Sequence, residues 1–246
     1  MKKNLILLHY LCIALSFSVD LHAQPSSGDG PAEQGTLKNA IGFYYKFIGE
    51  NSHLYIGSEY FSPVYNKEMH PFFQTFEFSN ADIYYDGVLY SNIPAMYDLI
   101  NDQVVINRYK QNFRIALKSE KVASFSISGH FFVRLVQDSL NQDFINTGFY
   151  DRLYNGRIQA YVQRKKKLEQ NIVQNQLEVK IVEADRYLIK RDNIFYAVNS
   201  RGSLLNALED HKKEIRKYFR KNSISFHENK ENAILVASQY YDQLLK

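Results

Sequence analysis

Basic side chains are concentrated on one predicted helix near the C-terminus. Within residues 203–221, apolar residues recur at helical spacing and cations occupy the opposite side. Like charges three or four residues apart share one side of a helix and repel each other, a cost that an anionic partner would relieve. The candidate contacts for such a partner are Lys212, Lys213, Arg216, Lys217, Arg220 and Lys221. The alternative is a solvated face that keeps the chain soluble, with Glu209, Asp210 and Glu214 near enough to neutralise part of it.

No catalytic motif accompanies these cations. The sequence has no G-x-S-x-G, phosphate loop or G-x-G-x-x-G, and His227-Glu228 fails as H-E-x-x-H because Glu231 stands where the second histidine is needed. Ser126, Ser128 and His130 lie close together, but the alternation of a strand explains them. We therefore expect no cofactor, no metal ion and no local catalytic set. An enzyme would have to assemble carboxylates or a histidine across the fold.

The N-terminus has the order of a secretory signal peptide. Two lysines follow Met1, an apolar run covers residues 5–19, and Ala23 offers a small residue at a cleavage point. The run is shorter than the roughly 20 apolar residues that span a bilayer. We predict that residues 1–23 are removed and that the mature chain is soluble and exported, either periplasmic or extracellular.

Export limits the chemistry and the partners of the mature chain. Cleavage removes Cys12, the only cysteine, so no disulfide and no cysteine nucleophile remains. It also removes two cations and one anion (Lys2, Lys3 and Asp20), so the formal charge of +4 becomes +3. A second basic run, residues 164–167, is a strand end or another anionic contact. Export argues against nucleic acid and leaves anionic lipid, glycan or an envelope protein as candidate partners.

The rest of the chain predicts one α+β domain. Residues 24–36 are rich in Pro, Gly and Ser and form a flexible lead. A single domain then covers 37–246, with a short helix around 37–48, a β-rich part over 72–198 and helices over 203–245. Strands followed by segregated helices are typical of α+β proteins rather than of alternating α/β folds.

Turn dipeptides divide the β-rich part. Asp86-Gly87 and Asn155-Gly156 each lie between apolar and aromatic runs, which is typical of a two-residue hairpin turn. Residues 191–193 predict a third hairpin. Helices predicted over 203–221 and 230–245 complete an antiparallel β-meander followed by a C-terminal helical hairpin.

Several segments resemble a family of proteins. Residues 87–98 (GVLYSNIPAMYD) are similar to a G-x-V/L-Y-x-N-I/V-P-x-x-Y-N/D pattern followed by a strand, here Val104–Ile106. The tail is also similar, with Tyr187–Lys190, the basic helix, residues 222–226 and a last helix carrying Tyr240-Tyr241. Both resemble an uncharacterised family of exported Bacteroidota proteins. The resemblance implies export and this architecture, and it supplies no active site.

These observations favour a non-enzymatic binding or structural protein of the cell envelope. Such a protein would present a sheet face or an aromatic groove to a lipid, glycan or partner protein. The alternative is an envelope hydrolase with a carboxylate- or histidine-based site. An enzyme should show a deep pocket in which titratable groups of perturbed pKa converge.

Signal-peptide cleavage gives the first testable prediction. Intact-mass measurement of the exported protein should give a chain that begins at Gln24. A mature mass that retains Met1 to Ala23 would contradict it.

Overall fold

The described part of the chain begins within the predicted domain. The computed structural model describes residues 53–61, 69–108, 113–139, 141, 144–173 and 176–245. The predicted signal peptide, flexible lead and helix over 37–48 lie outside the described residues.

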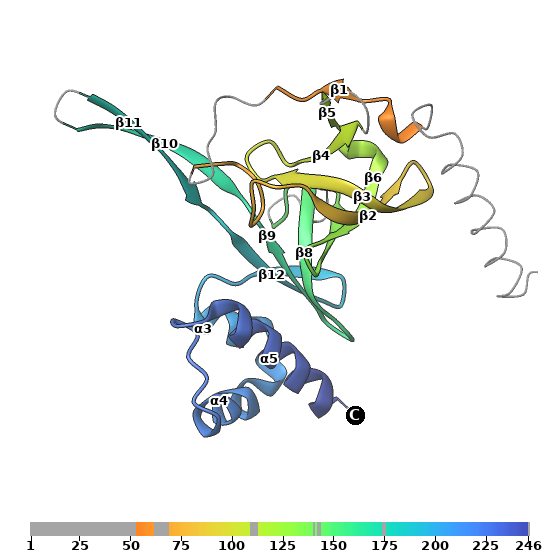
Figure 1. Cartoon of the computed structure of the whole chain (residues 1–246). Helices are drawn as coiled ribbons and strands as arrows, with labels where there is room; N and C mark the ends of the chain where they lie inside the picture. Colours follow the sequence, from red (N-terminus) through yellow and green to blue (C-terminus); the bar gives the residue numbers. More distant parts are fainter. Residues whose placement is uncertain are drawn as a thin grey trace, which may run out of the picture. The chain divides into compact units, whose positions relative to one another are not determined.

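An antiparallel sheet dominates this part (Figure 1), and eleven described strands belong to it. They are β1 (Ser58–Glu59), β2 (Ser79–Tyr85), β3 (Val88–Asp98), β4 (Gln103–Arg108), β5 (Phe113–Ala116), β6 (Val122–Ile127), β7 (His130–Leu135), β8 (Gly148–Asn155), β9 (Gln159–Gln163), β12 (Arg186–Arg191) and β13 (Ile194–Ala197). Two further strands, β10 (Lys166–Val173) and β11 (Gln176–Glu183), form a separate two-stranded sheet.

The chain meanders through the large sheet with three departures, the first of which is that β1 pairs with β5. Strands β2 to β5 pair in turn, and β6 then returns to the other side of β2. Strands β6 to β9 pair in turn, the β10–β11 hairpin follows, and β12 comes back to pair with β9. The predicted antiparallel meander and the α+β class are confirmed.

Local turn chemistry sets the hairpins. Asp86 and Gly87 join β2 to β3 with φ of 51° and 81°, because a two-residue turn of this hand needs positive φ at both positions. Asp192 and Asn193 join β12 to β13 in the same way, with φ of 50° and 64°. Both predicted turns are confirmed.

One predicted turn is longer than expected, and a further turn was not predicted. Asn155 ends β8 as expected, but the connection covers residues 156–158, with the Gly156 N–H donating to the Ile158 carbonyl at 2.9 Å. Ser128 and Gly129 form a turn with φ of 51° and 80°, so Ser126 and His130 lie on two strands rather than on one. Ser126 and His130 do lie on strands, but the turn between them was not predicted.

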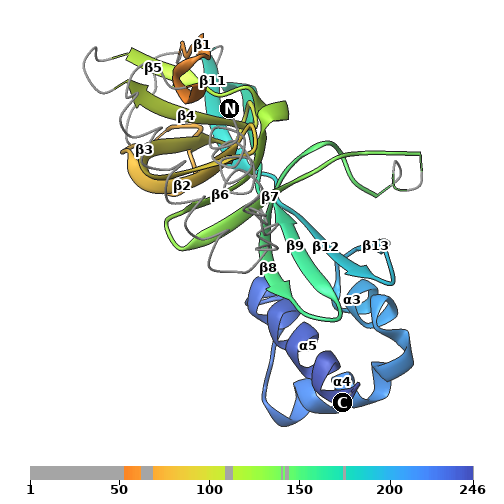
Figure 2. The same cartoon turned by 90° about the vertical axis from the view of Figure 1, so that its right-hand side faces the viewer.

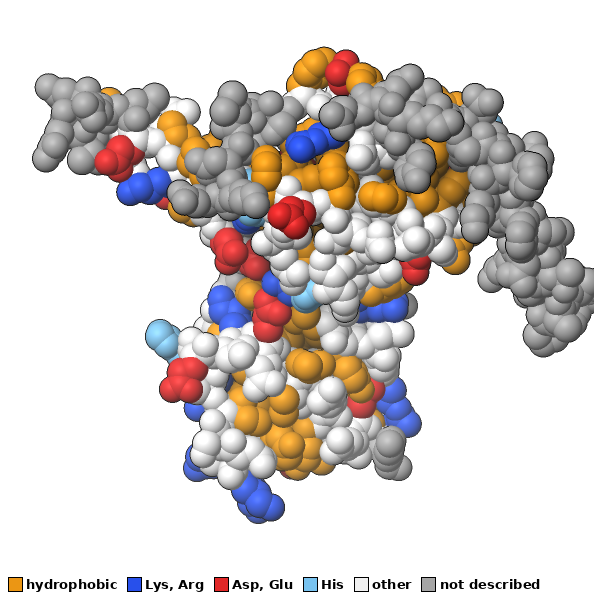
Figure 3. All heavy atoms as spheres, in the orientation of Figure 1, with side chains coloured by type: hydrophobic (Ala, Val, Ile, Leu, Met, Phe, Trp, Pro, Cys, Tyr) orange, Lys and Arg blue, Asp and Glu red, His pale blue; other side chains and the backbone are white. Residues whose placement is uncertain are grey.

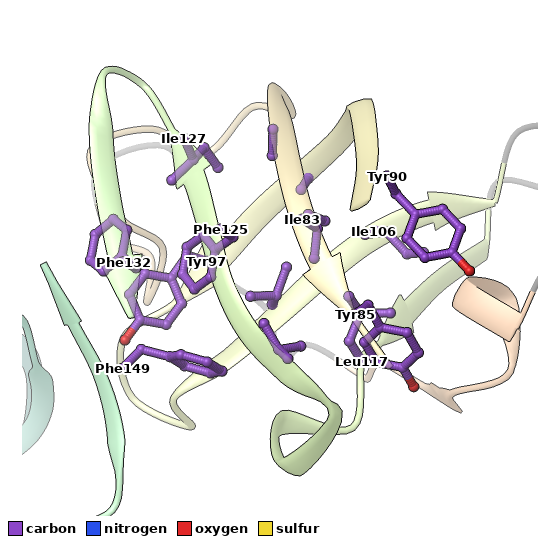
Figure 4. Close-up of a cluster of buried hydrophobic side chains, with 14 of the residues drawn as sticks. Ile83, Tyr85, Tyr90, Tyr97, Ile106, Leu117, Phe125, Ile127, Phe132 and Phe149 are labelled. Atoms are coloured by element: carbon purple, nitrogen blue, oxygen red, sulfur yellow. The ribbon is translucent and has the colours of Figure 1, made fainter. Parts of the chain in front are cut away.

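Aromatic side chains fill the core beneath β2–β8 (Figure 4). Tyr97, Phe125, Phe132 and Phe149 are buried there, and the Phe125 and Phe132 rings stack with centroids 4.8 Å apart. Tyr97 meets Phe125 edge-on at 5.1 Å. Each such pair contributes roughly 0.5–1.5 kcal/mol beyond the burial of its area. Period-two alternation places these rings on one face of the sheet.

Three helices end the chain, where two were predicted. They are α3 (Arg201–Ala207), α4 (Lys212–Lys221) and α5 (Lys230–Leu244), and a short 3-10 turn (Glu209–His211) separates the first two. The single helix predicted over 203–221 is therefore wrong at its middle. Asp210 explains the break, because its carboxylate accepts hydrogen bonds from Tyr241 Oη (2.7 Å) and Arg191 Nη1 (3.0 Å) and so holds the turn.

These helices cover one end of the sheet. Figures 1 and 2 both place them beside β8, β9, β12 and β13. Ile158, Ala160 and Ile189 of this end share a buried cluster with residues of all three helices, including Ile215 and Ile234. Near its C-terminal end, α5 also holds the β8–β9 connection: Asp242 Oδ2 accepts hydrogen bonds from Tyr154 Oη at 2.9 Å and the Arg157 N–H at 2.8 Å. Within the described residues, no helix has both the length and the apolar composition to cross a bilayer.

Packing of α5 against the sheet can be tested by one truncation. Ile234→Ala should lower the free energy of unfolding by about 2–5 kcal/mol, because Ile234 is fully buried and its removal leaves a cavity. Urea denaturation measures the change. The matched control is Gln239→Ala, an exposed position on the same helix that should stay within about 0.5 kcal/mol of wild type. Equal stabilities for the two variants would contradict this packing.

Candidate functional site

The predicted basic residues form an exposed face on α4. Ile215 and Phe219 of this helix are buried, which turns the opposite side to solvent. Five of the six candidate contacts are exposed on α4, namely Lys213, Arg216, Lys217, Arg220 and Lys221. No described acid lies within ion-pair distance of any of these five residues. We call these five residues the α4 basic face. In Figure 3, Lys and Arg side chains lie over the lower end of the helical part, where Figure 1 draws α4.

Lys212, the sixth candidate, differs from the other five. It is half-buried, and its Nζ donates a hydrogen bond to Asn206 Oδ1 at 2.7 Å. Lys212 therefore has a partner within the chain, and the structure places it at the start of the helix rather than among the unpaired cations.

Two of the three acids near α4, Glu209 and Asp210, lie close to Arg191 instead of to the α4 basic face. Arg191 lies 3.0 Å from an Asp210 oxygen and 3.8 Å from a Glu209 oxygen. Burial alone would raise the pKa of Asp210, but the hydrogen bonds from Tyr241 and from the backbone, together with the charge of Arg191, outweigh burial and hold this pKa below its usual value. Glu214 remains the one acid on α4 itself. The α4 basic face is therefore largely without internal compensation.

A second charged cluster, around Arg164, was not predicted. Arg164 directly follows β9, and its side chain is only 11% exposed. Its Nε and Nη2 donate to Asp151 Oδ2 at 2.9 and 2.8 Å, and its Nη1 lies 3.5 Å from Asp185. Asp151 is 2% exposed, so its charge would be costly without this partner. We call Arg164, Asp151, Asp185 and Glu231 the Arg164 cluster.

Glu231 connects this cluster to α5. Its two oxygens accept hydrogen bonds from Arg164 Nη1 and Nη2 at 2.6 and 3.0 Å, a bidentate arrangement. It lies in the first turn of α5, where the helix dipole favours a negative charge. The hydrogen bonds from Arg164 hold the pKa of Glu231 below its usual value, and burial raises the pKa of Tyr187, whose hydroxyl donates to the same carboxylate at 3.2 Å.

His130 and Asp151 form the histidine–carboxylate pair of the described residues that comes nearest to a catalytic arrangement. His130 Nδ1 lies 2.7 Å from Asp151 Oδ2, on neighbouring strands β7 and β8. Such a pair activates a nucleophile when the other ring nitrogen is free to take a proton. Here Nε2 lies 3.2 Å from Gln74 Nε2, and no described hydroxyl is hydrogen-bonded to His130. The Asp151 oxygen that faces His130 is also the one that pairs with Arg164.

A shallow groove lies next to the Arg164 cluster. Its volume is about 520 Å³, and it is lined by Leu153, Tyr187, Glu228, Asn229, Lys230, Glu231, Asn232 and Leu235. Glu231 and Tyr187 reach it, but both are already hydrogen-bonded to the chain itself. Within the described ranges, no three metal-ligating side chains converge on one point.

The other basic run is not a surface patch. Arg164 is buried in its cluster, and Lys166 Nζ donates to the carbonyl oxygens of His70 and Phe72 at 3.1 and 2.9 Å. Lys167 is the exposed member and lies 2.8 Å from Glu169. The side chains of Arg164, Lys166 and Lys167 are therefore engaged within the chain, unlike those of the α4 basic face.

Comparison with protein-family models, curated proteins and solved structures gives no significant match. The resemblance to exported Bacteroidota proteins therefore stays a prediction.

Removing the Arg164 side chain should strongly destabilise the fold. Arg164→Met leaves Asp151 and Glu231 without their shared cation, and breaking a buried pair in this way costs about 3–5 kcal/mol of unfolding free energy. Lys167→Met, three positions along and 58% exposed, is the control and should change little.

The pH dependence separates a charge effect from a packing effect. Because the pKa of Glu231 is below its ordinary 4.5, its stabilisation is present above pH 4.5 and is lost as the pH falls through the folded-state value. Asp185 acts in the opposite sense, since burial raises its pKa. In Arg164→Met the free energy of unfolding should therefore fall less steeply below pH 4.5 than in wild type. An unchanged slope would show that Arg164 acts through packing alone.

Proposed function

We propose that this chain is an exported, non-enzymatic binding protein of the cell envelope, and that its α4 basic face binds an anionic lipid surface. The observation that carries the proposal is five exposed cations on one helix side without a described acid partner. A helix that only needed solubility would do as well with mixed charges, which avoid the repulsion between neighbours.

The arrangement of these cations fits an extended layer of anions. They are spread over residues 213–221, about two and a half helical turns. The two described grooves are lined by other residues, so neither would hold a small anion against this face. A cation close to an anionic bilayer contributes about 1 kcal/mol, and the contributions of several add up to a useful surface affinity.

The hydrolase alternative has the His130–Asp151 pair in its favour. Two contacts and the shape of the surface count against it: Asp151 is shared with Arg164, Nε2 of His130 lies beside Gln74, and the adjacent groove is shallow. Each of these groups already has a partner that explains its position. The binding proposal is therefore the better supported of the two.

Charge reversal on α4 tests the proposal. The triple variant Lys213→Glu, Lys217→Glu, Arg220→Glu should lose sedimentation with phosphatidylglycerol-containing vesicles. Wild type should bind them at about 50 mM salt and weakly at about 300 mM, because the screening length shortens from roughly 14 to 6 Å. Vesicles of phosphatidylcholine alone should bind neither protein.

The matched control carries the same charge change elsewhere. Lys118→Glu, Lys121→Glu, Lys167→Glu alters three exposed lysines outside α4 and should keep most of the binding. Equal binding by the two triple variants would contradict a specific α4 face. Binding to a soluble anionic glycan but not to anionic vesicles would overturn the lipid assignment.

A further inference from the structure

The β10–β11 hairpin forms a sheet of its own. Its strands have eight residues each and pair in register from Lys166↔Glu183 to Val173↔Gln176. Neither strand pairs with another strand of the described chain. In Figure 1 the hairpin extends away from the strands labelled β3 to β9. A two-stranded ribbon by itself is marginally stable in water, so its length is unusual without a further contact.

The two edges of the ribbon differ. At the β10 side, the Lys166 N–H donates to the Leu99 carbonyl and Lys166 Nζ donates to His70 and Phe72, so this strand begins against the large sheet. No described residue outside β10 forms a backbone hydrogen bond with β11. The outer edge of β11 therefore presents unpaired peptide groups, which can pair with another strand.

One face of the ribbon is apolar and exposed. Leu168 and Ile172 are 46% and 77% exposed, and their face also carries Val179 and Ile181. None of these four residues belongs to a buried cluster of the described chain. An exposed apolar row beside a free strand edge marks a surface that associates with another chain.

Charges on the opposite face select the partner. Glu178 and Lys180 lie on one face of β11 and form an ion pair within the chain at 3.2 Å, and Glu169 of β10 lies directly opposite Lys180. Glu178 and Lys180 are two residues apart and of opposite sign, so the edge is complementary to its own copy when run antiparallel. Opposite charges stabilise facing positions of a sheet, and like charges destabilise them.

We propose that β11 pairs with β11 of a second copy of this chain, antiparallel and centred on Val179. In this register Lys180 faces Glu178 of the second copy, and Glu178 faces its Lys180. Each Lys180 then lies between Glu169 of its own chain and Glu178 of the other. The two ribbons become a four-stranded sheet.

Neighbouring registers lack this match. Centring the pair on Glu178 or on Lys180 places identical charges opposite each other. Centring it on Ile181 places Lys180 opposite Val182 and leaves Glu178 without a cation. Register in a sheet is set by such facing pairs, so the sequence of β11 favours the Val179-centred arrangement.

The expected dimer is weak. An edge of eight residues buries less than the roughly 1,200–2,000 Å² of a stable specific interface. Sedimentation velocity should therefore show an equilibrium between monomer and dimer that depends on protein concentration. This dimerisation is independent of lipid binding, and either can fail without the other.

Exchanging the charges tests the register. Glu178→Lys and Lys180→Glu should each weaken dimerisation about tenfold or more, since both facing pairs become like-charged. An equimolar mixture of the two variants should form a mixed dimer, because lysines then face glutamates. Variants that dimerise as well as wild type, or a mixture no better than its components, would overturn the register.

A cross-link provides a second measurement that needs no charge change. In a Cys12→Ser background, Val179→Cys should form a disulfide-linked dimer on mild oxidation, since facing Cα atoms in antiparallel strands are about 4.5–5.5 Å apart. Ile181→Cys is the control, because in this register residue 181 of the second copy lies four residues, or about 14 Å, farther along the strand from the position that faces Ile181. A wild-type chain that stays monomeric at every concentration, or equal cross-linking at both positions, would refute the pairing.

Discussion

The charge of Arg164 is the interaction on which the arrangement of sheet and helices depends. One guanidinium is hydrogen-bonded to both Asp151 on β8 and Glu231 at the start of α5 and lies close to Asp185 just before β12. Buried ion pairs are costly to form, and costlier to break once their partners are buried. The cluster therefore fixes where α5 begins on the sheet. The apolar contacts of Ile234 and its neighbours then supply most of the stabilisation.

This division of charge bears on function. Inside the protein, each member of the Arg164 cluster is matched by a partner, so the His130–Asp151 pair is part of a structural network. The five cations of the α4 basic face have no such match among the described residues, although Arg191 holds two nearby acids through the turn before the helix. The proposed anionic partner depends on this unbalanced charge on α4.

Features that depend on neighbouring residues could be predicted, and those that depend on distant residues could not. The turns at Asp86-Gly87 and Asp192-Asn193 follow from side chains that tolerate positive φ. Ser128-Gly129 forms the same kind of turn, but it was not predicted, because apolar and polar residues alternate on both sides of it without interruption. The exposed face of α4 follows from helical periodicity alone, whereas the break before α4 depends on Tyr241, 31 residues after Asp210.

The Arg164 cluster had no usable sequence signal, because its acids lie 13, 21 and 67 residues away along the chain.

The central claim is that α4 meets an anionic surface, and lysine footprinting of the wild-type protein tests it most directly. Acetylation of Lys213, Lys217 and Lys221, measured by mass spectrometry, should slow in the presence of phosphatidylglycerol vesicles, while Lys118 and Lys167 react as before. Unchanged reactivity on α4, or equal protection of all five lysines, would contradict the account.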